Sequence, residues 1–350
     1  MPGEPAPWFK APTPSNPEFI FDTAAGRYVL LAFLPKEDQA ASAEALRALA
    51  ANRSQFDDER ASAFVVTRDE GTWATAQDMR GLRWFIDLDG AISRLYGALT
   101  KDGSEHPMWL LLDPSLRVIG RVRLGNPQMI FDFVQRLGAP SGHAGVPLHA
   151  PVLIVPRIFE PELCRQLIAL HQADGGRLTG VMRDAGDRTV AVMDELKRRR
   201  DVVVEDESLK ATLRDRLERR LFPLVARGLG FAVTEIERYL VSCYDAAEEG
   251  VFHAHRDSTT FGTAHRKFAC SLNLNDDFEG GDLRFPEFGA RTYRAPPGGA
   301  VVFSCALLHE ATRVSAGRRY AFLPFFYDEA GAQVLAAYRA RIGAAEEPAA

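Results

Sequence analysis

The spacing of hydrophobic residues divides the chain into two parts with different periodicity. In the first part, short continuous apolar runs alternate with segments whose apolar residues recur at helical spacing. Continuous runs are typical of buried strands, and their alternation with helical segments is typical of a mixed sheet covered by helices. The pattern predicts strands over residues 28–34, 63–67, 84–87, 108–112 and 116–123, and helices over residues 39–51, 72–79, 91–99 and 127–137.

The middle of the chain carries the best candidate for a linker. Residues 138–147, GAPSGHAGVP, are mostly small residues and proline, a composition typical of connections between domains. After it we expect a strand over 152–155, an amphipathic helix over 162–173 and a core helix over 208–229. The polar, weakly patterned segment 175–206 is our candidate for a lid or substrate loop.

Beyond residue 231 the pattern changes to short strands separated by Gly, Pro and Asp turns. A closely spaced series of this kind predicts a β-sandwich or barrel. The expected strands cover residues 234–243, 251–256, 267–275, 281–284, 291–294, 300–304 and 320–327.

A length of 350 residues agrees with two domains. We expect a first domain over residues 1–140, a linker over 141–149, a second domain over 150–335, and a helical or disordered tail over 336–350.

The overall charge argues against binding to nucleic acid or to a membrane surface, because such binding usually needs a basic excess. The formal net charge is −5 and the pI is about 6.0. One basic run, residues 197–200, is the exception, and we interpret it as a solvated face in preference to a docking site for a polyanion or a substrate.

The N-terminal residues lack the plan of a signal peptide, and no apolar stretch is long enough to span a bilayer. We therefore expect a cytoplasmic protein. The four cysteines are scattered without metal-binding spacing, which predicts reduced, buried thiols, and none of them lies within residues 1–150.

The candidate chemistry lies in the strand-rich second part. His255 and Asp257 are two residues apart, so on a strand both would project from one face. His309 follows far along the chain, and Arg319 comes ten residues later. Two imidazoles and one carboxylate form the donor set that holds Fe(II) and leaves positions open for a co-substrate and O₂. This pattern predicts an oxygenase.

The second domain resembles the Fe(II)- and 2-oxoglutarate-dependent dioxygenases of the prolyl 4-hydroxylase type. The resemblance rests on YDAAEEGVFHAHRD, SLNLN, EGGDLRF, PPGGAVVFS and HEATRVSAGRRYAFLPFFYD, in that order. It implies a double-stranded β-helix, or jelly-roll, with supporting helices. It also implies metal ligation and catalysis by His255, Asp257 and His309, and use of Fe(II), 2-oxoglutarate and O₂, with ascorbate as a supporting reductant.

The same resemblance assigns the co-substrate contacts. Arg319 would bind the remote carboxylate of 2-oxoglutarate, with the adjacent Arg318 as the alternative, and Tyr244 and Asn273 would add polar contacts. Asn273 departs from the family, in which many members carry tyrosine at this position. His253 competes with His255 as a ligand but lacks the matching carboxylate, and we expect His265 to be structural or near the substrate mouth.

The first domain resembles the peroxiredoxin version of the thioredoxin fold. The matching fragments are GEPAPWF, FDTAAGRYVLLAF, FIDLDGAISRLYG and HPMWLLLDPSLRVIGRV. A peroxiredoxin needs a cysteine after the first of its core strands, and here that region, PKEDQAASAEALRA, contains none. Because the thiolate is the nucleophile, we expect this domain to be redox-silent and to serve dimerisation or substrate docking.

The resemblance implies hydroxylation of a C–H bond in a peptide, a protein residue or a small metabolite, with release of succinate and CO₂. Two alternatives belong to other classes. One is a binding or sensing scaffold with an iron-loaded barrel. The other is a redox partner related to thiol peroxidases, which the missing cysteine disfavours.

Overall fold

The chain divides after Ala150 into two units in the computed structural model, which describes residues 1–343. The first unit comprises Met1–Ala150 with Pro286–Ala290, and the second comprises Pro151–Phe285 with the residues from Arg291 onward. Each unit has its own buried hydrophobic core. The tail predicted over residues 336–350 lies partly outside the described residues, and its described part belongs almost entirely to helix α8 (Glu329–Ile342).

The first unit is built on a five-stranded mixed sheet with the order β5-β4-β3-β6-β7. Strands β3, β4 and β5 are parallel, and β6 and β7 run antiparallel to their neighbours. The sheet strands are β3 (Tyr28–Phe33), β4 (Ala61–Thr67), β5 (Leu82–Ile86), β6 (Met108–Leu112) and β7 (Val118–Arg123). The short strands β1 (Lys10–Ala11) and β2 (Phe19–Ile20) pair separately.

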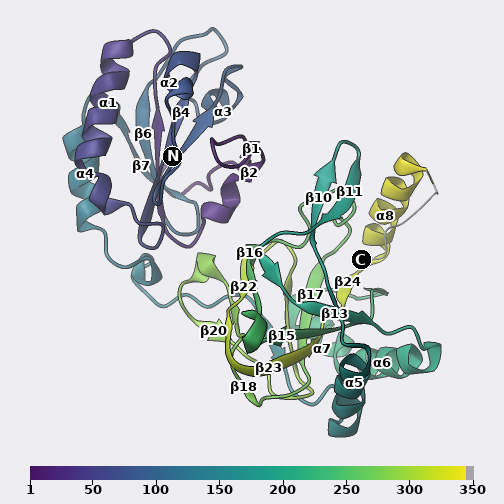
Figure 1. Ribbon diagram of the computed structural model, residues 1–350. Helices are drawn as coiled ribbons and strands as arrows, with labels where there is room; N and C mark the ends of the chain where they lie inside the picture. Colours follow the sequence, from purple (N-terminus) through teal and green to yellow (C-terminus); the bar gives the residue numbers. More distant parts are fainter. Residues whose placement is uncertain (344–350) are drawn as a thin grey trace. The chain divides into compact units, whose positions relative to one another are not determined.

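Both faces of this sheet are covered, which explains why its strands are continuously apolar. Helices α1 (Gln39–Ala51) and α4 (Pro127–Arg136) lie on one face (Figure 1), where Leu49 and Phe131 join the core. An aromatic cluster lies on the other face, where the Phe64 and Phe85 rings stack at 5.3 Å. The remaining helices are α2 (Glu70–Ala74) and α3 (Ala91–Leu95).

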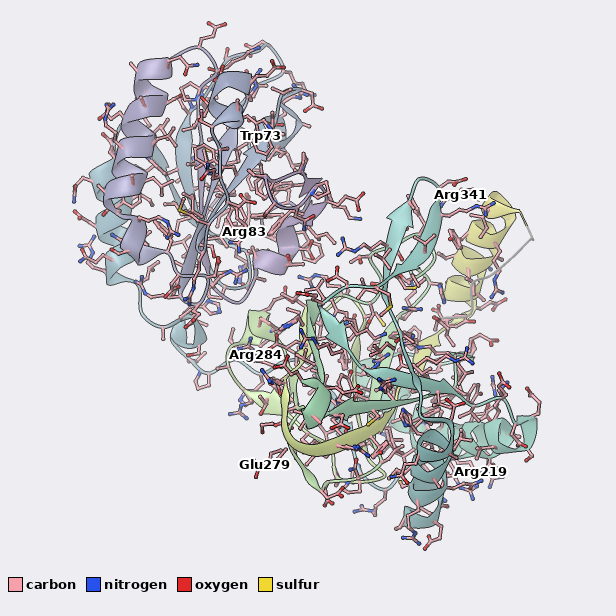
Figure 2. All side chains as sticks on the ribbon, in the orientation of Figure 1. Trp73, Arg83, Arg219, Glu279, Arg284 and Arg341 are labelled. Atoms are coloured by element: carbon pink, nitrogen blue, oxygen red, sulfur yellow. The ribbon has the colours of Figure 1, made fainter. Side chains whose placement is uncertain are left out.

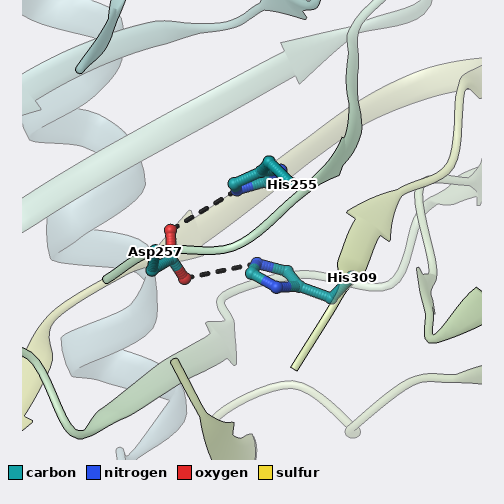
Figure 3. Close-up of side chains that lie close together, drawn as sticks. All are labelled: His255, Asp257 and His309. Atoms are coloured by element: carbon teal, nitrogen blue, oxygen red, sulfur yellow. Dashed lines mark ion pairs between the residues drawn. The ribbon is translucent and has the colours of Figure 1, made fainter. Parts of the chain in front are cut away.

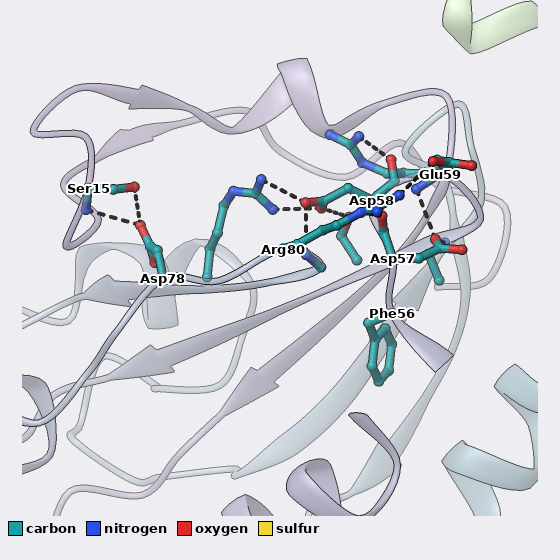
Figure 4. A network of polar contacts seen from close by, with 12 residues as sticks. Ser15, Phe56, Asp57, Asp58, Glu59, Asp78 and Arg80 are labelled. Atoms are coloured by element: carbon teal, nitrogen blue, oxygen red, sulfur yellow. Dashed lines mark hydrogen bonds and ion pairs between the residues drawn. The ribbon is translucent and has the colours of Figure 1, made fainter. Parts of the chain in front are cut away.

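A polar network ties the ends of β4 and β5 together (Figure 4). Arg83 donates two hydrogen bonds to the Asp58 carboxylate, at 2.7 and 2.9 Å. The Ser62 hydroxyl and the Gly81 backbone N–H donate to the same carboxylate, at 2.7 and 2.8 Å. Burial acts to raise the pKa of Asp58, but these hydrogen bonds outweigh burial and hold the pKa well below its ordinary value.

The described part of the second unit contains two large antiparallel sheets and a separate two-stranded hairpin. The larger follows the path β14-β24-β17-β23-β15-β13-β9, with β18, β21 and β8 attached, and the smaller has the order β12-β16-β22-β19-β20. The larger sheet consists of β8 (Leu153–Val155), β9 (Arg177–Leu178), β13 (Arg200–Val203), β14 (Glu235–Glu237), β15 (Leu240–Asp245), β17 (Phe268–Asn273), β18 (Phe278–Gly280), β21 (Ala300–Ser304), β23 (Val314–Phe322) and β24 (Phe325–Tyr327). The smaller consists of β12 (Lys197–Arg198), β16 (Val251–His255), β19 (Leu283–Arg284), β20 (Thr292–Tyr293) and β22 (His309–Ala311).

Three helices, α5 (Pro161–Asp174), α6 (Glu207–Arg220) and α7 (Phe222–Leu229), pack on the larger sheet. Leu167 and Leu213 from these helices share a core with Leu272 and Phe322 from the strands. Because strand residues alternate between faces, the neighbours of Leu272 and Phe322 in β17 and β23 point to the opposite side. That side carries the residues described below, and the arrangement is the jelly-roll with supporting helices that the sequence predicted.

Several predicted elements were too long because of single backbone positions. The helix expected over 208–229 is two helices, since Pro223 lacks the N–H that a continuous helix needs. The strand expected over 234–243 breaks at Arg238, whose φ is +51°. The strand expected over 320–327 breaks before Phe325, directly after Pro324. Strands β18 and β22 were not predicted, and the helix expected over 72–79 is α2, which begins earlier after the capping residue Asp69.

The polar segment 175–206 is largely strand. It contains the hairpin of β10 (Val181–Ala185) and β11 (Arg188–Val192), together with β9, β12 and β13. The Thr189 backbone N–H donates to the Tyr338 hydroxyl of α8 at 2.8 Å, and the Gly262 N–H donates to the Thr189 hydroxyl at 2.7 Å. These bonds tie the hairpin to α8 and to the loop that follows Asp257.

Within residues 1–343, none of the helices has the length and apolar character that a bilayer-crossing helix requires.

Candidate metal centre and co-substrate pocket

Two histidines and one aspartate converge at the end of strand β16 (Figure 3). Asp257 Oδ1 lies 3.4 Å from His255 Nε2, and Asp257 Oδ2 lies 3.3 Å from His309 Nε2. One ligand atom from each residue lies within 4.8 Å of the others. Two imidazoles and a carboxylate are the donor set that holds Fe(II) and leaves coordination positions free. The three side chains therefore fit an Fe(II) ion.

The sequence predicted that His255 and Asp257 project from the same face of one strand, but the backbone positions them differently. Strand β16 ends at His255, and Asp257 lies in the turn beyond it, where its N–H donates to the Cys305 carbonyl at 3.0 Å. His309 begins β22 and lies directly opposite His255. Strand alternation therefore does not explain the position of Asp257, because the turn after the strand places its carboxylate.

Backbone carbonyls select the nitrogen that each histidine presents. His255 Nδ1 lies 2.7 Å from the His253 carbonyl, and His309 Nδ1 lies 3.0 Å from the Leu307 carbonyl. A carbonyl only accepts hydrogen bonds, so each Nδ1 carries the proton and each Nε2 keeps a free lone pair. Both lone pairs belong to the nitrogens that approach Asp257. This second layer of contacts favours metal binding.

Burial and neighbouring charges shift the pKa values of His255 and Asp257. Burial lowers the pKa of His255, and the neighbouring His309 lowers it further. Burial acts to raise the pKa of Asp257, but His309 and His255 outweigh burial and hold it well below its ordinary value. Neutral imidazole and ionised carboxylate are the forms that bind a metal ion.

Arg319 enters the same pocket, whereas Arg318 does not line it. The pocket is lined by residues of both sheets, the three ligand candidates and Arg319. Arg319 is 3% exposed, and its Nη2 donates to the Ser271 hydroxyl at 2.6 Å. The Arg318 side chain is 59% exposed and pairs with Asp245 at 2.6 Å. Strand alternation in β23 separates the two guanidinium groups.

Asn273 and Tyr244, the other predicted contacts, both lie next to Arg319. The Asn273 side-chain oxygen accepts from Arg319 Nε at 3.1 Å, while its nitrogen donates to the Ala295 carbonyl at 2.8 Å. The Tyr244 ring centroid lies 5.2 Å from the Arg319 guanidinium carbon. Asn273 therefore orients the arginine, and Tyr244 lines the pocket beside it.

The basic run 197–200 is not the solvated face that we expected. Lys197 and Arg199 are 8% and 4% exposed, because alternate residues of this extended segment point inward. Arg199 Nη2 donates to Asp201 at 2.8 Å and its Nη1 donates to the Tyr244 hydroxyl at 3.2 Å. Reading the run with the period of a strand would have revealed its two buried cations.

Neither of the other histidines considered joins the metal ligands. His253 is exposed and lies in a separate surface pocket. His265 is 2% exposed, and its Nε2 lies 2.8 Å from a Glu237 oxygen, which gives it a structural role. The four cysteines are buried and free, as predicted.

Comparison with known proteins finds two segments of the chain that match family models. Residues 239–327 match the 2OG-Fe(II) oxygenase superfamily, and residues 2–121 match the AhpC/TSA family. A PKHD-type hydroxylase from Synechococcus sp. (strain CC9605) is 33% identical over 90 residues, which cover 25% of this chain and 40% of the relative. The chain thus spans less than half the length of this curated relative.

Solved structures of prolyl hydroxylases and of a peroxiredoxin are similar to parts of this chain. A prolyl hydroxylase from Trichoplax adhaerens, in complex with a hypoxia inducible factor peptide, covers 53% of this chain and 86% of its own, with 16% identity and a TM-score of 0.43. A prolyl-4-hydroxylase from Pseudomonas putida covers 51% and 94%, with 16% identity and a TM-score of 0.37. A 2-Cys peroxiredoxin from Plasmodium vivax covers 38% and 93%, with 20% identity and a TM-score of 0.33. The two family matches thus cover separate segments of the chain, one similar to the AhpC/TSA family and the other to the 2OG-Fe(II) oxygenase superfamily.

Proposed function

We propose that the second unit is an Fe(II)- and 2-oxoglutarate-dependent hydroxylase, with His255, Asp257 and His309 as the metal ligands. The observation that carries the proposal is the convergence of one atom from each of these residues within 4.8 Å, beside a buried arginine in the same pocket. When bound, iron and 2-oxoglutarate supply an oxidant that converts a C–H bond, O₂ and 2-oxoglutarate into a hydroxylated product, succinate and CO₂.

Arg319 is the proposed anchor for the remote carboxylate of 2-oxoglutarate. A guanidinium can bind a carboxylate through two parallel hydrogen bonds, and burial strengthens them. Arg319 is buried, and within residues 1–343 its guanidinium donates hydrogen bonds to the neutral side chains of Ser271 and Asn273, which do not balance its charge. Ser271, Asn273 and Tyr244 would hold the guanidinium in place.

Asp257 bears on the type of product. Relatives that halogenate have a small residue at this position, which lets a halide bind iron. The carboxylate of Asp257 instead fills the third protein position, so hydroxylation is the proposed outcome. The proposed substrate is a peptide, a protein residue or a small metabolite.

The first unit has no part in this chemistry. Its residues 2–121 match the AhpC/TSA family, and it resembles peroxiredoxins, but residues 1–150 contain no cysteine to act as the nucleophile. We propose docking or dimerisation as its role. The cytoplasm is the proposed compartment, supported by four cysteines that are all free.

The test is an anaerobic titration of the protein with Fe(II) and then 2-oxoglutarate. We expect a weak visible charge-transfer band that needs both additions, and on admission of O₂ we expect succinate. No band from the native protein would overturn the metal and co-substrate assignment. A band with succinate release that no peptide or metabolite extract stimulates would instead favour a sensing scaffold.

A further inference from the structure

Arg238 is a second arginine of this pocket that has no acidic partner. It lies between β14 and β15 and lines the pocket that contains the metal-ligand candidates and Arg319. Within residues 1–343, the contact of its guanidinium is with the Phe325 ring, whose centroid lies 4.4 Å away. Its Nε is buried and has no hydrogen-bond partner. The residue as a whole is partly exposed. A partly desolvated charge without a counter-charge is unfavourable, so an arginine in this state fits an incoming anion.

The two carboxylates whose charges act on Arg238, Glu237 and Asp201, are already engaged by other groups. Glu237 accepts from Arg266 at 2.5 and 2.7 Å and lies 2.8 Å from His265 Nε2. Asp201 accepts from Arg199 and from the Ser242 hydroxyl, and Lys197 lies 3.5 Å away. Burial, and then the charge of Arg266, lower the pKa of Arg238 to about 10. Glu237 and Asp201 act in the opposite direction, but within residues 1–343 neither forms an ion pair with the Arg238 guanidinium.

The backbone at Arg238 is held in an unusual conformation. Its φ of +51° lies in the left-handed region, which residues with a side chain rarely adopt. Such strain persists where the surrounding structure fixes it, and it is concentrated at functional sites. Here it interrupts what would otherwise be a continuous strand from β14 to β15.

A count of charges indicates that the proposed iron and co-substrate do not need the positive charge of Arg238. The two positive charges of iron and the one of Arg319 balance the single charge of Asp257 and the two of 2-oxoglutarate. Arg199, the third arginine of the pocket, is paired with Asp201. Once the proposed iron and co-substrate are bound, the charge of Arg238 is the one in this set that remains unmatched.

We propose that the primary substrate carries a carboxylate that binds Arg238, on an aliphatic body that packs against Leu323, Pro324 and Phe325. These three residues line the same pocket and supply its apolar wall beside the guanidinium. A planar guanidinium matches a carboxylate through paired hydrogen bonds. The inference rests on the proposed function and adds the chemical class of the substrate.

The experiment measures binding with the co-substrate position filled. The full-length protein is held without O₂ with Fe(II) and N-oxalylglycine, an unreactive analogue of 2-oxoglutarate, and is titrated calorimetrically. The probes are straight and branched monocarboxylic acids of two to six carbons, each paired with its primary amide, and the corresponding alkyl phosphates. We expect at least one acid to bind at least tenfold more tightly than its amide and more tightly than its phosphate.

Two variants connect this preference to Arg238. In Arg238→Met and Arg238→Gln, the affinity for that acid should fall at least tenfold, to that of the amide, while binding of N-oxalylglycine stays within twofold. The second readout distinguishes loss of the anion site from misfolding. Arg219→Met is the matched control, because Arg219 lies on α6 (Figure 2) with its side chain 78% exposed.

The possible failures are distinguishable. If the native protein does not bind N-oxalylglycine, the proposed function fails and this inference fails with it. If N-oxalylglycine binds but no acid binds more tightly than its amide, or the phosphates bind best, only the carboxylate inference is overturned. The same holds if both Arg238 variants keep the affinity for the acid.

Discussion

His255 and His309 are directly opposite each other across β16 and β22, and their ring centroids lie 4.4 Å apart. This cross-strand pair fixes two of the proposed metal ligands relative to each other. Phe252 stacks on the His255 ring at 3.5 Å, and the Phe303 centroid lies 4.5 Å from that of His309. Both imidazoles are therefore held by packing as well as by their carbonyl partners, an arrangement typical of a preorganised site.

The first prediction concerns metal binding. Asp257→Ala should weaken binding of Mn(II), a redox-stable substitute for Fe(II), by at least roughly 100-fold, because one of three protein ligands is lost. Calorimetric titration of the purified protein measures it. His253→Ala is the control and should change the affinity less than about threefold, since His253 points to a different pocket. Equal losses in the two variants would contradict the assigned ligand set.

The second prediction separates two adjacent arginines. Arg319→Met should weaken binding of 2-oxoglutarate roughly 30- to 150-fold, because hydrogen bonds to a charged group contribute about 2–3 kcal/mol. Arg318→Met should change it less than about twofold, because Arg318 pairs with Asp245 at the surface. The measurement is the dependence of the anaerobic charge-transfer band on 2-oxoglutarate concentration. A larger effect of Arg318→Met would show that Arg318, and not Arg319, binds the carboxylate of 2-oxoglutarate.

The third prediction concerns the hairpin of β10 and β11. Replacing residues 181–192 with a short Gly-Ser turn should leave Mn(II) affinity within about threefold, because the hairpin contributes no ligand. Product formation should fall by at least roughly tenfold, because the hairpin supports the loop after Asp257 through the Thr189 contact with Gly262. Mass spectrometry of a substrate that gains one oxygen atom measures the second effect. An unchanged product yield would exclude a role in substrate binding.

The fourth prediction concerns the stability of the first unit and its pH dependence. The folded-state pKa of Asp58 is depressed, so its stabilising contribution is present above the ordinary value of 3.8 and is lost as the pH falls through the folded-state pKa. At pH 7, Asp58→Asn should lower the free energy of unfolding by about 2 kcal/mol, because the charged partner of Arg83 is removed. The difference should shrink as the pH is lowered below that value.

Tryptophan fluorescence during urea unfolding measures this effect selectively. All four tryptophans of the chain lie within residues 1–150, so the signal follows the first unit. Asp132→Asn, at an exposed position of α4, is the control and should change stability by less than about 0.5 kcal/mol at any pH. A constant difference between native protein and Asp58→Asn from pH 7 to pH 3 would contradict the depressed pKa.

The sequence by itself determined the two-part architecture and the identity of the ligand candidates. Continuous apolar runs predicted buried strands such as β6 and β21 with the bounds that the structure has, because burial on both faces leaves no room for polar residues. The order of histidine, aspartate, histidine and arginine predicted the candidate site, because imidazole and carboxylate donors suit Fe(II) and a guanidinium suits a carboxylate co-substrate.

The tertiary structure alone decided how those residues meet. Asp257 lies in a turn, so no strand period could place it, and β22 is too short to show a pattern around His309. The burial of Lys197 and Arg199 depends on the neighbouring strand β16 and on Asp201, which local composition does not reveal. That Arg238 lacks an ion-pair partner also depends on which groups the nearby carboxylates contact in the folded chain. Ion pairs form between residues that are far apart in the sequence. The order of residues shows which side chains are charged, but the fold decides which of them meet.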